Sequence, residues 1–428
     1  QLSGLGGHTP YFKKLLDKFG IEFQVVKVGT YKSAVEPYIL EHMSEPARAQ
    51  LDTLYNAMWS KIKGEIAASR KIHSQEIDSL INNEFILCRK LNVALDNGLI
   101  DGLLYRHEMD SRLAEMMGVE KADNIEKVDP INLASSNISK ANQPHIAVVY
   151  ACGGIDDGDA SGIVSTDLVP LIFDLKDNEN VEGLILRVNS PGGSAYGSEQ
   201  IWEALEQFKK TGKPFIVSMG DYAASGGYYI SCGADSIFAD PLTVTGSIGI
   251  FGLIPNGHEL LTDKLGVNFE LVATNPQAMF PNLMSPLTTE QYNAMQRMVE
   301  DGYDLFTQRV ADGRGLSQDY VKQIGEGRVW SAEKALEIGL VDRIGTLDAA
   351  IKYMAQKLSY GDTPNVVAYP DAKDSFWTYM AMLENGNAAQ LAQKLGLRSQ
   401  EEAMLMQLRW LIQRPMIQAR MADMVIKL

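Results

Sequence analysis

The sequence is poor in cysteine and has no long apolar run, and each shortage excludes a class of protein. The three cysteines (Cys88, Cys152 and Cys232) have no CxxC spacing. This argues against a disulfide framework or a zinc site, so we expect small buried thiols and neither a metal nor a cofactor. No run of about 18 apolar residues is present, so we expect no segment of this sequence to span a bilayer.

Basic charge is also scarce. The net charge is −15 and the isoelectric point about 4.9, so no general basic field is available to neutralise phosphates. We therefore exclude nucleic acid as a partner. Apolar residues make up 45% of the chain and charged residues 22%, which is typical of a soluble globular protein, and 428 residues predict two or three domains.

What the sequence does contain is a broken internal repeat. The stretch Gly20–Val26 recurs as Gly266–Val272, and Gly98–Asp101 recurs as Gly339–Asp342. The offsets are 246 (266 − 20) and 241 (339 − 98) residues. Self-similarity at a nearly fixed period indicates two copies of one structural unit. Because Gln1 falls inside a copy, we expect further sequence upstream of it.

The repeat predicts the domain organisation. We expect a partial first repeat over 1–130, a polar linker over 131–143, a second repeat over 144–355 and a Met-rich helical extension over 356–428. In the second repeat, apolar strands alternate with helical runs, which predicts βαβ units and a largely parallel sheet, an α/β fold. The extension is either core or an adaptable apolar surface for peptides, a membrane or a neighbouring subunit.

A serine follows an apolar strand in a glycine-rich turn. Ser225 lies in Gly220–Tyr229 (GDYAASGGYY), between the strand expected over 215–219 and a helical run. At a helix N-terminus the dipole and the free N–H groups favour developing negative charge, and the following glycines allow a substrate backbone to approach. Ser225 is therefore a candidate nucleophile, with an ordinary helix-capping serine as the alternative.

Two further glycine-spaced turns carry groups suited to catalysis. Gly192 follows an apolar strand that ends at Asn189, where N–H groups at the carboxyl edge of a parallel sheet suit an oxyanion. No Gly-Lys-Ser/Thr follows, which disfavours a phosphate loop. Ser247 is the central hydroxyl of the other turn, Val244–Gly249. Taken singly, each is equally well an ordinary turn.

The base that would activate Ser225 is not an obvious histidine. None of the six histidines lies in a glycine-spaced turn or has an acidic partner at metal-ligand spacing. A lysine can act as the base if burial lowers its pKa towards neutrality. Lys32 follows the apolar strand expected over 23–28, whereas Ala278 stands at the aligned position of the second copy. An ordinary surface lysine is the alternative.

The combination of these segments resembles the signal peptide peptidase family, membrane-bound serine proteases of the protease IV type in the Clp protease and crotonase fold superfamily. The resemblance covers about residues 1–355 and implies tandem domains of the long, duplicated form, in which the first copy supplies the lysine and the second the serine. The segments that carry it are Gly29–Pro37, Asn189–Gly193, Asp221–Tyr229 and Thr245–Gly249.

The resemblance also implies roles and partners. Ser225 would be the nucleophile, Lys32 the general base and Ser247 the residue that orients the Lys32 amine, while the N–H groups of Gly192 and Gly226 would form the oxyanion hole. The implied substrates are apolar signal-peptide remnants. The implied assembly is a homotetramer, anchored in the inner membrane by an N-terminal helix that this sequence lacks, with the catalytic part on the periplasmic, extracytoplasmic side.

Two other functions stay open at this point. A crotonase-like acyl-CoA enzyme would use the same paired N–H groups to hold a thioester enolate, but its chemistry favours Glu or Asp bases. A non-catalytic scaffold is the third possibility, and the joint presence of Ser225, Lys32 and the glycine turns argues against it.

Overall fold

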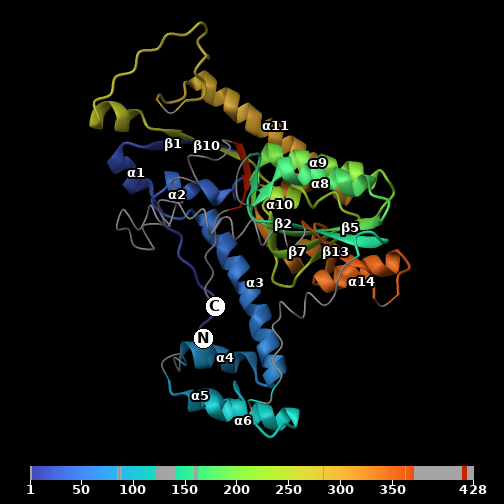
Figure 1. Cartoon of the computed structure of the whole chain (residues 1–428). Coiled ribbons are helices and arrows are strands. Elements are labelled where there is room, and N and C mark those ends of the chain that lie inside the picture. The colour runs from blue at the N-terminus through green and yellow to red at the C-terminus, as the bar shows by residue number, and fades with distance from the viewer. Residues whose placement is uncertain are drawn as a thin grey trace. The chain divides into compact units, whose positions relative to one another are not determined.

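The computed structural model describes residues 2–83, 86, 89–121, 123, 125, 140–158, 162–282, 284–361, 363–370 and 417–421. The chain divides into two compact units (Figure 1). One unit comprises 1–7, 55–140 and 426–428, and the other comprises 8–54 and 141–425. This division follows spatial contacts, so the repeat boundaries 1–130, 131–143, 144–355 and 356–428 stay predictions, and most of the linker lies outside the described residues.

The smaller unit is helical in its described part. It contains most of the long helix α3 and three shorter helices. Ile77 and Leu80 bury the apolar face of one of them. The helices are α3 (Glu45–Arg70), α4 (Ser74–Asn82), α5 (Leu91–Asp96) and α6 (Arg106–Met117).

The larger unit is built on a mostly parallel sheet in the order β11-β9-β7-β5-β2-β13. Strands β2, β5, β7 and β13 pair in parallel, and β7 pairs in parallel with β8 along one half and with β9 along the other. The strands are β2 (His145–Cys152), β5 (Val181–Ser190), β7 (Phe215–Ala224), β8 (Ser236–Ala239), β9 (Val244–Gly246), β11 (Val329–Ser331), β12 (Arg343–Ile344) and β13 (Val366–Tyr369).

Helices cover both faces of this sheet, as continuous apolar strands require. Figure 1 shows α8 (Ser165–Asp177) and α9 (Ala195–Lys209) on one face and α14 (Leu347–Lys357) on the other. Buried residues such as Leu186 and Val217 pack on the first side, and Ile185 and Ile216 on the second. The predicted α/β class with βαβ units is confirmed.

A second sheet brings distant segments of the chain together. Its order is β1-β10-β14-β6-β3-β4, and β1 pairs with β10 antiparallel over six residue pairs. The first-copy strand therefore lies beside the chain that follows Ser247. The strands are β1 (Glu22–Lys27), β3 (Ile155–Asp156), β4 (Ile163–Val164), β6 (Gly192–Ser194), β10 (Phe251–Asn256) and β14 (Ile417–Arg420).

The remaining helices surround these sheets. They are α1 (Lys13–Phe19), η1 (Ser33–Val35), α2 (Glu36–Ile39), α10 (Gly226–Tyr229), η4 (Leu260–Lys264), α11 (Thr289–Arg314), α12 (Gln318–Ile324) and α13 (Ala332–Glu337). Among the described residues, no helix has the length and apolarity needed to cross a membrane.

One local expectation is untested and another differs from the structure. The predicted Met-rich helical extension over 356–428 is described only at 356–361, 363–370 and 417–421, which contain the end of α14 and the strands β13 and β14, so the helical extension stays a prediction. Both strands form by pairing with a strand that is distant in sequence, so their conformation is set by tertiary contact. Cys232 is buried as expected, Cys152 is exposed, and Cys88 lies outside the described residues.

Candidate active site

Ser225 sits on a sharp turn between a strand and a helix. Strand β7 ends at Ala224 and α10 begins at Gly226, so Ser225 alone makes the change of direction, with φ +56° and ψ −116°. Positive φ is costly for a residue with a Cβ, and such strain gathers at functional sites. The turn is fixed by the Ser225 N–H, which donates to Gly246 O at 2.7 Å, and the residue is fully buried.

Lys32 is carried into the same region by a close approach of two loops. Gly29 has φ +102°, and a Cβ placed there would lie 2.4 Å from the backbone of Glu326. Gly327 has φ +75°, and a Cβ there would lie 2.8 Å from Lys32 N. Glycine at both positions therefore lets the first-copy loop pack directly on the loop before β11. Lys32 is 1% exposed as a result.

The structure brings Lys32 and Ser225 together although 193 residues separate them. Lys32 Nζ lies 2.7 Å from Ser225 Oγ, 3.0 Å from Ser247 O and 3.2 Å from Ser247 Oγ. This is the distance expected for a nucleophile and the base that deprotonates it. The predicted proximity of these two residues is thus present within one chain.

The electrostatics of this arrangement favour a neutral amine. Burial lowers the pKa of Lys32 well below the usual value of 10.5, because desolvation disfavours the charged form. The amine contacts a hydroxyl and a carbonyl rather than a carboxylate. This amine can therefore hold an unshared electron pair at a lower pH than an exposed lysine can, which favours a role as general base.

Ser247 fixes the position of the amine. Its backbone is also in the left-handed region, with φ +53°, and its N–H donates to Arg328 O at 2.6 Å. Its hydroxyl donates to Gly327 O at 3.2 Å while lying within reach of Lys32 Nζ. The side chain and the carbonyl of Ser247 therefore contact the same amine from two directions.

The two predicted oxyanion glycines lie against each other. A Cβ placed on Gly192 would lie 2.6 Å from Gly226 N, and one placed on Gly226 would lie 3.2 Å from Gly192 Cα. The Gly192 N–H donates to Ser190 Oγ at 3.1 Å. Both glycines also face the carbonyl oxygen of Ala419 in β14. All five predicted site residues are therefore gathered in one buried region.

Sequence reasoning missed the contributions of two other segments. The loop that holds Lys32 in place is Gly325–Arg328, in which the pattern Gly-Glu-Gly before an apolar strand was the available signal. The strand β14 was missed because nothing local to it indicates a strand that pairs with β6 and β10.

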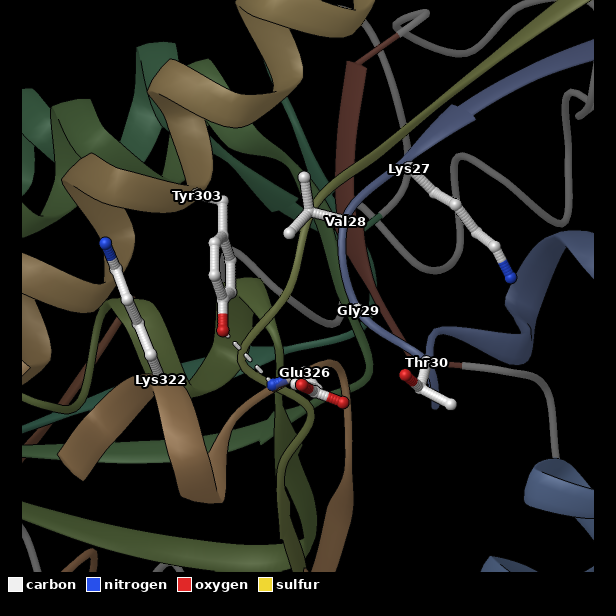
Figure 2. Close-up of a pocket in the computed structure, with 7 residues that line it drawn as sticks. All are labelled: Lys27, Val28, Gly29, Thr30, Tyr303, Lys322 and Glu326. Atoms are coloured by element: carbon white, nitrogen blue, oxygen red, sulfur yellow. Dashed lines mark hydrogen bonds between the residues drawn. The ribbon is translucent and has the colours of Figure 1, made fainter. Parts of the chain in front are cut away.

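A pocket of about 410 Å³ lies beside Gly29 and Thr30, in the loop that leads to Lys32 (Figure 2). The Tyr303 hydroxyl accepts the Glu326 N–H at 3.2 Å across it, and Figure 2 shows the side chain of Lys27 directed away from that pair. Neither Lys32 nor Ser225 lines it, so it is not the site of the dyad. Its lining is Lys27, Val28, Gly29, Thr30, Tyr303, Lys322 and Glu326.

The described residues contain no group of three or more His, Cys, Asp or Glu side chains that could hold a metal ion. The arrangement that they do contain, a buried amine beside a serine hydroxyl and two adjacent glycine N–H groups, is suited to acyl transfer.

Comparisons with known proteins agree with this chemistry. The sequence profile of the family described as Peptidase family S49 matches residues 1–120 and 207–360. Protease 4 of Haemophilus influenzae is 36% identical over 367 residues, which are 83% of this chain and 59% of that protein. Protease 4 of Salmonella typhi is 36% identical over 385 residues, 86% of this chain and 62% of that protein.

One further curated protein and one solved structure are also similar to this chain. The chloroplastic serine protease SPPA of Arabidopsis thaliana is 30% identical over 373 residues, 83% of this chain and 54% of that protein. A solved structure of a ClpP1 mutant from Listeria monocytogenes has a TM-score of 0.33 and 14% identity, covering 48% of this chain and 94% of that one. The chain thus spans about three fifths of the length of the Protease 4 relatives.

Proposed function

The chain belongs to peptidase family S49, and we propose that it is a serine endopeptidase with Ser225 as nucleophile and Lys32 as general base. The observation that carries the proposal is the 2.7 Å between Lys32 Nζ and Ser225 Oγ in a buried site. The lowered pKa of Lys32, which follows from its burial, supports the role of base. The names of the relatives support peptide hydrolysis as the reaction.

The first half of the reaction forms an acyl-enzyme. Neutral Lys32 takes the proton of Ser225 as Oγ attacks the carbonyl carbon of the substrate. The N–H groups of Gly192 and Gly226 stabilise the oxyanion, and the Gly192 N–H, which donates to Ser190 Oγ in this structure, then shares its hydrogen with the oxyanion. Protonated Lys32 gives its proton to the departing amine, and the peptide bond breaks.

The second half releases the acyl group. A water molecule gives a proton to the again neutral Lys32 and attacks the ester carbon, and the same two N–H groups hold the oxyanion. Ser225 recovers its proton as the ester bond breaks. Ser247 keeps the amine beside Ser225 throughout, because it contacts Lys32 Nζ through both its carbonyl and its hydroxyl.

The substrates that we propose are apolar, extended peptides, including signal-peptide remnants. Extended peptides pair with a strand edge and place alternate side chains in pockets. The residues beside the turns of the site are small or apolar, namely Ala195, Ile248 and Ile250. We expect cleavage after Leu, Ala or similar residues and poor cleavage after Asp, Glu or Lys.

The cellular setting that we propose rests on the family resemblance. The two copies form one duplicated protein, assembled as a homotetramer at the inner membrane with the catalytic part on the extracytoplasmic side. Size-exclusion chromatography with light scattering tests the tetramer.

Acylation with a serine-directed probe tests the proposed chemistry. A β-lactam or a similar acylating agent should add one acyl group, and mass spectrometry should locate it on the peptide that contains Ser225. Ser225→Ala should take up none. Ser231→Ala, which removes a buried hydroxyl that donates to Gly227 O, should be labelled like the wild type. Acyl-CoA turnover that survives Ser225→Ala would instead indicate a crotonase-like enzyme.

A further inference from the structure

The two proposed oxyanion donors come from separate elements of the larger unit. The Gly192 N–H belongs to β6, whose last residue, Ser194, caps α9 by accepting the Gly197 N–H at 3.0 Å. The Gly226 N–H belongs to the first residue of α10. Donors of an oxyanion hole need a fixed spacing, because a displacement of about 1 Å can cost roughly a hundredfold in rate. The contacts between α9 and α10 therefore decide the geometry of the hole.

One such contact lies directly beside Gly226. Helices α9 and α10 are neighbours (Figure 1), and a Cβ on Gly226 would lie 2.6 Å from Ser198 Oγ of α9. This buried hydroxyl donates to Ser194 O at 2.7 Å, in the residue that joins β6 to α9. The first turn of α9 is thus packed on the first residue of α10.

A second contact joins the same two helices through a carboxylate. Glu199, the next residue of α9, accepts the hydroxyl of Tyr229, the last residue of α10, at 2.6 Å. The Tyr229 N–H donates to Ser225 O at 2.8 Å, so this tyrosine is also bonded to the residue that carries the nucleophile. Tyr229 is 2% exposed, and its ring stacks on Phe306 with the centroids 4.4 Å apart. A displacement of Glu199 would therefore move α10 and with it the Gly226 N–H.

Arg309 of α11 fixes the orientation of this carboxylate. Its Nη2 donates to Glu199 Oε1 at 2.7 Å and its Nε donates to Oε2 at 3.4 Å. The guanidinium also lies 3.8 Å from the ring centroid of Trp202, one turn further along α9. A two-point contact holds the plane of the carboxylate, which the single bond from Tyr229 would leave free to rotate.

The Tyr229 hydroxyl stays protonated at any pH at which Lys32 titrates. Burial, and then the hydrogen bond to Glu199, raise the pKa of Tyr229 well above the usual value of 10.0, whereas burial lowers the pKa of Lys32. The contact between Glu199 and Tyr229 is therefore independent of the ionisation of the proposed base.

We propose that Glu199 is a positioning residue of the oxyanion hole, which sets the spacing of the Gly192 and Gly226 N–H groups by holding Tyr229, and that Arg309 orients Glu199. The proposal rests on the proposed function, because it needs an oxyanion beside Ser225. Glu199 takes no part in the making or breaking of bonds. Its loss should lower the rate, whereas the loss of an ordinary ion pair between helices would lower only stability.

Tyr229→Phe tests the proposal by removing the hydroxyl alone. The ring keeps its stacking on Phe306, and Glu199 keeps its contact with Arg309. We expect kcat for an apolar peptide to fall about tenfold with KM nearly unchanged, since the oxyanion exists only in the transition state and the intermediates. The pH at which kcat/KM reaches half its maximum should stay the same, because Lys32 is untouched.

Tyr228→Phe is the matched control on the same helix. The Tyr228 hydroxyl is also buried, but it donates to Leu340 O at 2.8 Å, outside α9. This variant should lower the free energy of unfolding and keep its kcat. An equal loss of kcat in Tyr228→Phe and Tyr229→Phe would show that the link to α9 has no special role and would overturn the proposal.

Changes at Glu199 separate its hydrogen bonds from its charge. The amide of Glu199→Gln can still bond to both the Tyr229 hydroxyl and Arg309, whereas Glu199→Ala loses both contacts. Glu199→Ala should therefore lower kcat about tenfold or more, and Glu199→Gln should recover most of that loss. If Glu199→Gln is as slow as Glu199→Ala, positioning through Tyr229 is wrong. Tyr229→Phe and Glu199→Gln decide the question if Glu199→Ala does not fold.

An apolar peptide aldehyde reports on the oxyanion hole without turnover. Ser225 Oγ adds to the aldehyde carbon, the serine proton passes to Lys32, and the new oxyanion lies at the two N–H groups, as in the transition state. Tyr229→Phe should raise the inhibition constant of a leucine-ended tripeptide aldehyde about tenfold. Binding of the corresponding peptide alcohol, which has no carbonyl, should not change.

The aldehyde also separates this proposal from the proposed function. If the wild type forms the adduct on Ser225 and Tyr229→Phe binds the aldehyde equally well, the positioning role of Glu199 is overturned while the proposed function stands. If the wild type forms no adduct and its Ser225 is not acylated by the β-lactam probe, both proposals fail.

Discussion

The segments that follow the two copies of the repeat, Gly20–Val26 and Gly266–Val272, contain helices of the same lengths, which we call the framework. They differ in their chemically reactive side chains. Helices α3 and α11 each contain 26 residues. The short helices α5 and α13 each contain 6 residues and are followed by a glycine with positive φ, Gly98 and Gly339. Yet the aligned positions Lys32 and Ala278 differ completely, because the lysine is buried and the alanine is exposed in a turn.

This comparison indicates that the framework and the reactive groups are under separate constraints. Helix lengths and glycine ends depend on local packing, which both copies need. Burial of an amine lowers the stability of the fold, since desolvation opposes its charge. We therefore expect a buried amine to be kept where it has a function. We interpret Lys32 as the base that the first copy supplies to the nucleophile of the second, so changes at the site should affect rate and changes in the framework should affect stability.

The largest effect should come from a change of the base. Lys32→Arg keeps a long cationic side chain, but its guanidinium stays protonated and cannot accept the Ser225 proton. We expect kcat/KM for an apolar peptide to fall by about 10⁴ or more, as when a catalytic dyad member is lost. Lys27→Arg in strand β1 is the control and should keep its activity. Near-normal turnover of Lys32→Arg would remove Lys32 from the mechanism.

A smaller loss should follow from filling the oxyanion hole. In Gly192→Ala the new Cβ would lie 2.6 Å from Gly226 N and would occupy the space of the oxyanion. Loss of one such interaction costs about 10²–10³ in rate, measured as kcat. Proline is unsuitable here, because φ at Gly192 is +93°, far from the proline value near −65°.

The matched control for this change is Gly64→Ala in α3. A Cβ there meets nothing within 4 Å, so activity should be unchanged. A folded Gly192→Ala protein with the wild-type rate would show that the oxyanion hole lies elsewhere.

The smallest effects should come from the helix caps of the framework. Thr288 caps α11 by accepting the Gln291 N–H at 3.2 Å, and Ser44 accepts the Ala47 N–H at 3.3 Å near the start of α3. Thr288→Ala should lower the free energy of unfolding by about 1 kcal/mol. Ser44→Ala should cost more, because Ser44 also donates to the buried carboxylate of Glu36 at 2.6 Å.

Denaturant unfolding followed by circular dichroism measures the free energy of unfolding of both cap variants. Thr288→Ala should retain wild-type kcat/KM. A large loss of activity without loss of stability in Thr288→Ala would contradict the separation between framework and site.

Much of this architecture could be predicted from the sequence. Apolar runs predicted the strands that became β5 and β7, because these elements depend on their own residues. The glycine-spaced turns likewise pointed to Ser225, Gly192 and Ser247. The complementary presence of Lys32 and absence of a lysine at Ala278 directed attention to the dyad.

The rest depended on contacts between distant segments. Residues 266–272 repeat the sequence of 20–26, yet only the first copy forms a strand, β1, because only it pairs with β10. The strand at 417–420 has no local signal at all, since it is set by pairing with β6 and β10. Sequence periodicity reports local structure, and neither of these segments is determined locally.

The pH dependence of peptide hydrolysis tests the role of Lys32 most directly. Burial lowers the pKa of this amine, so its neutral, reactive form should increase with pH and be nearly complete well below 10.5. For hydrolysis of an apolar peptide by the wild-type chain, kcat/KM should therefore rise with pH and level off well before the usual titration range of lysine. A rate that is independent of pH, that falls as pH rises, or that climbs only near 10.5 would contradict a neutral Lys32 as the base.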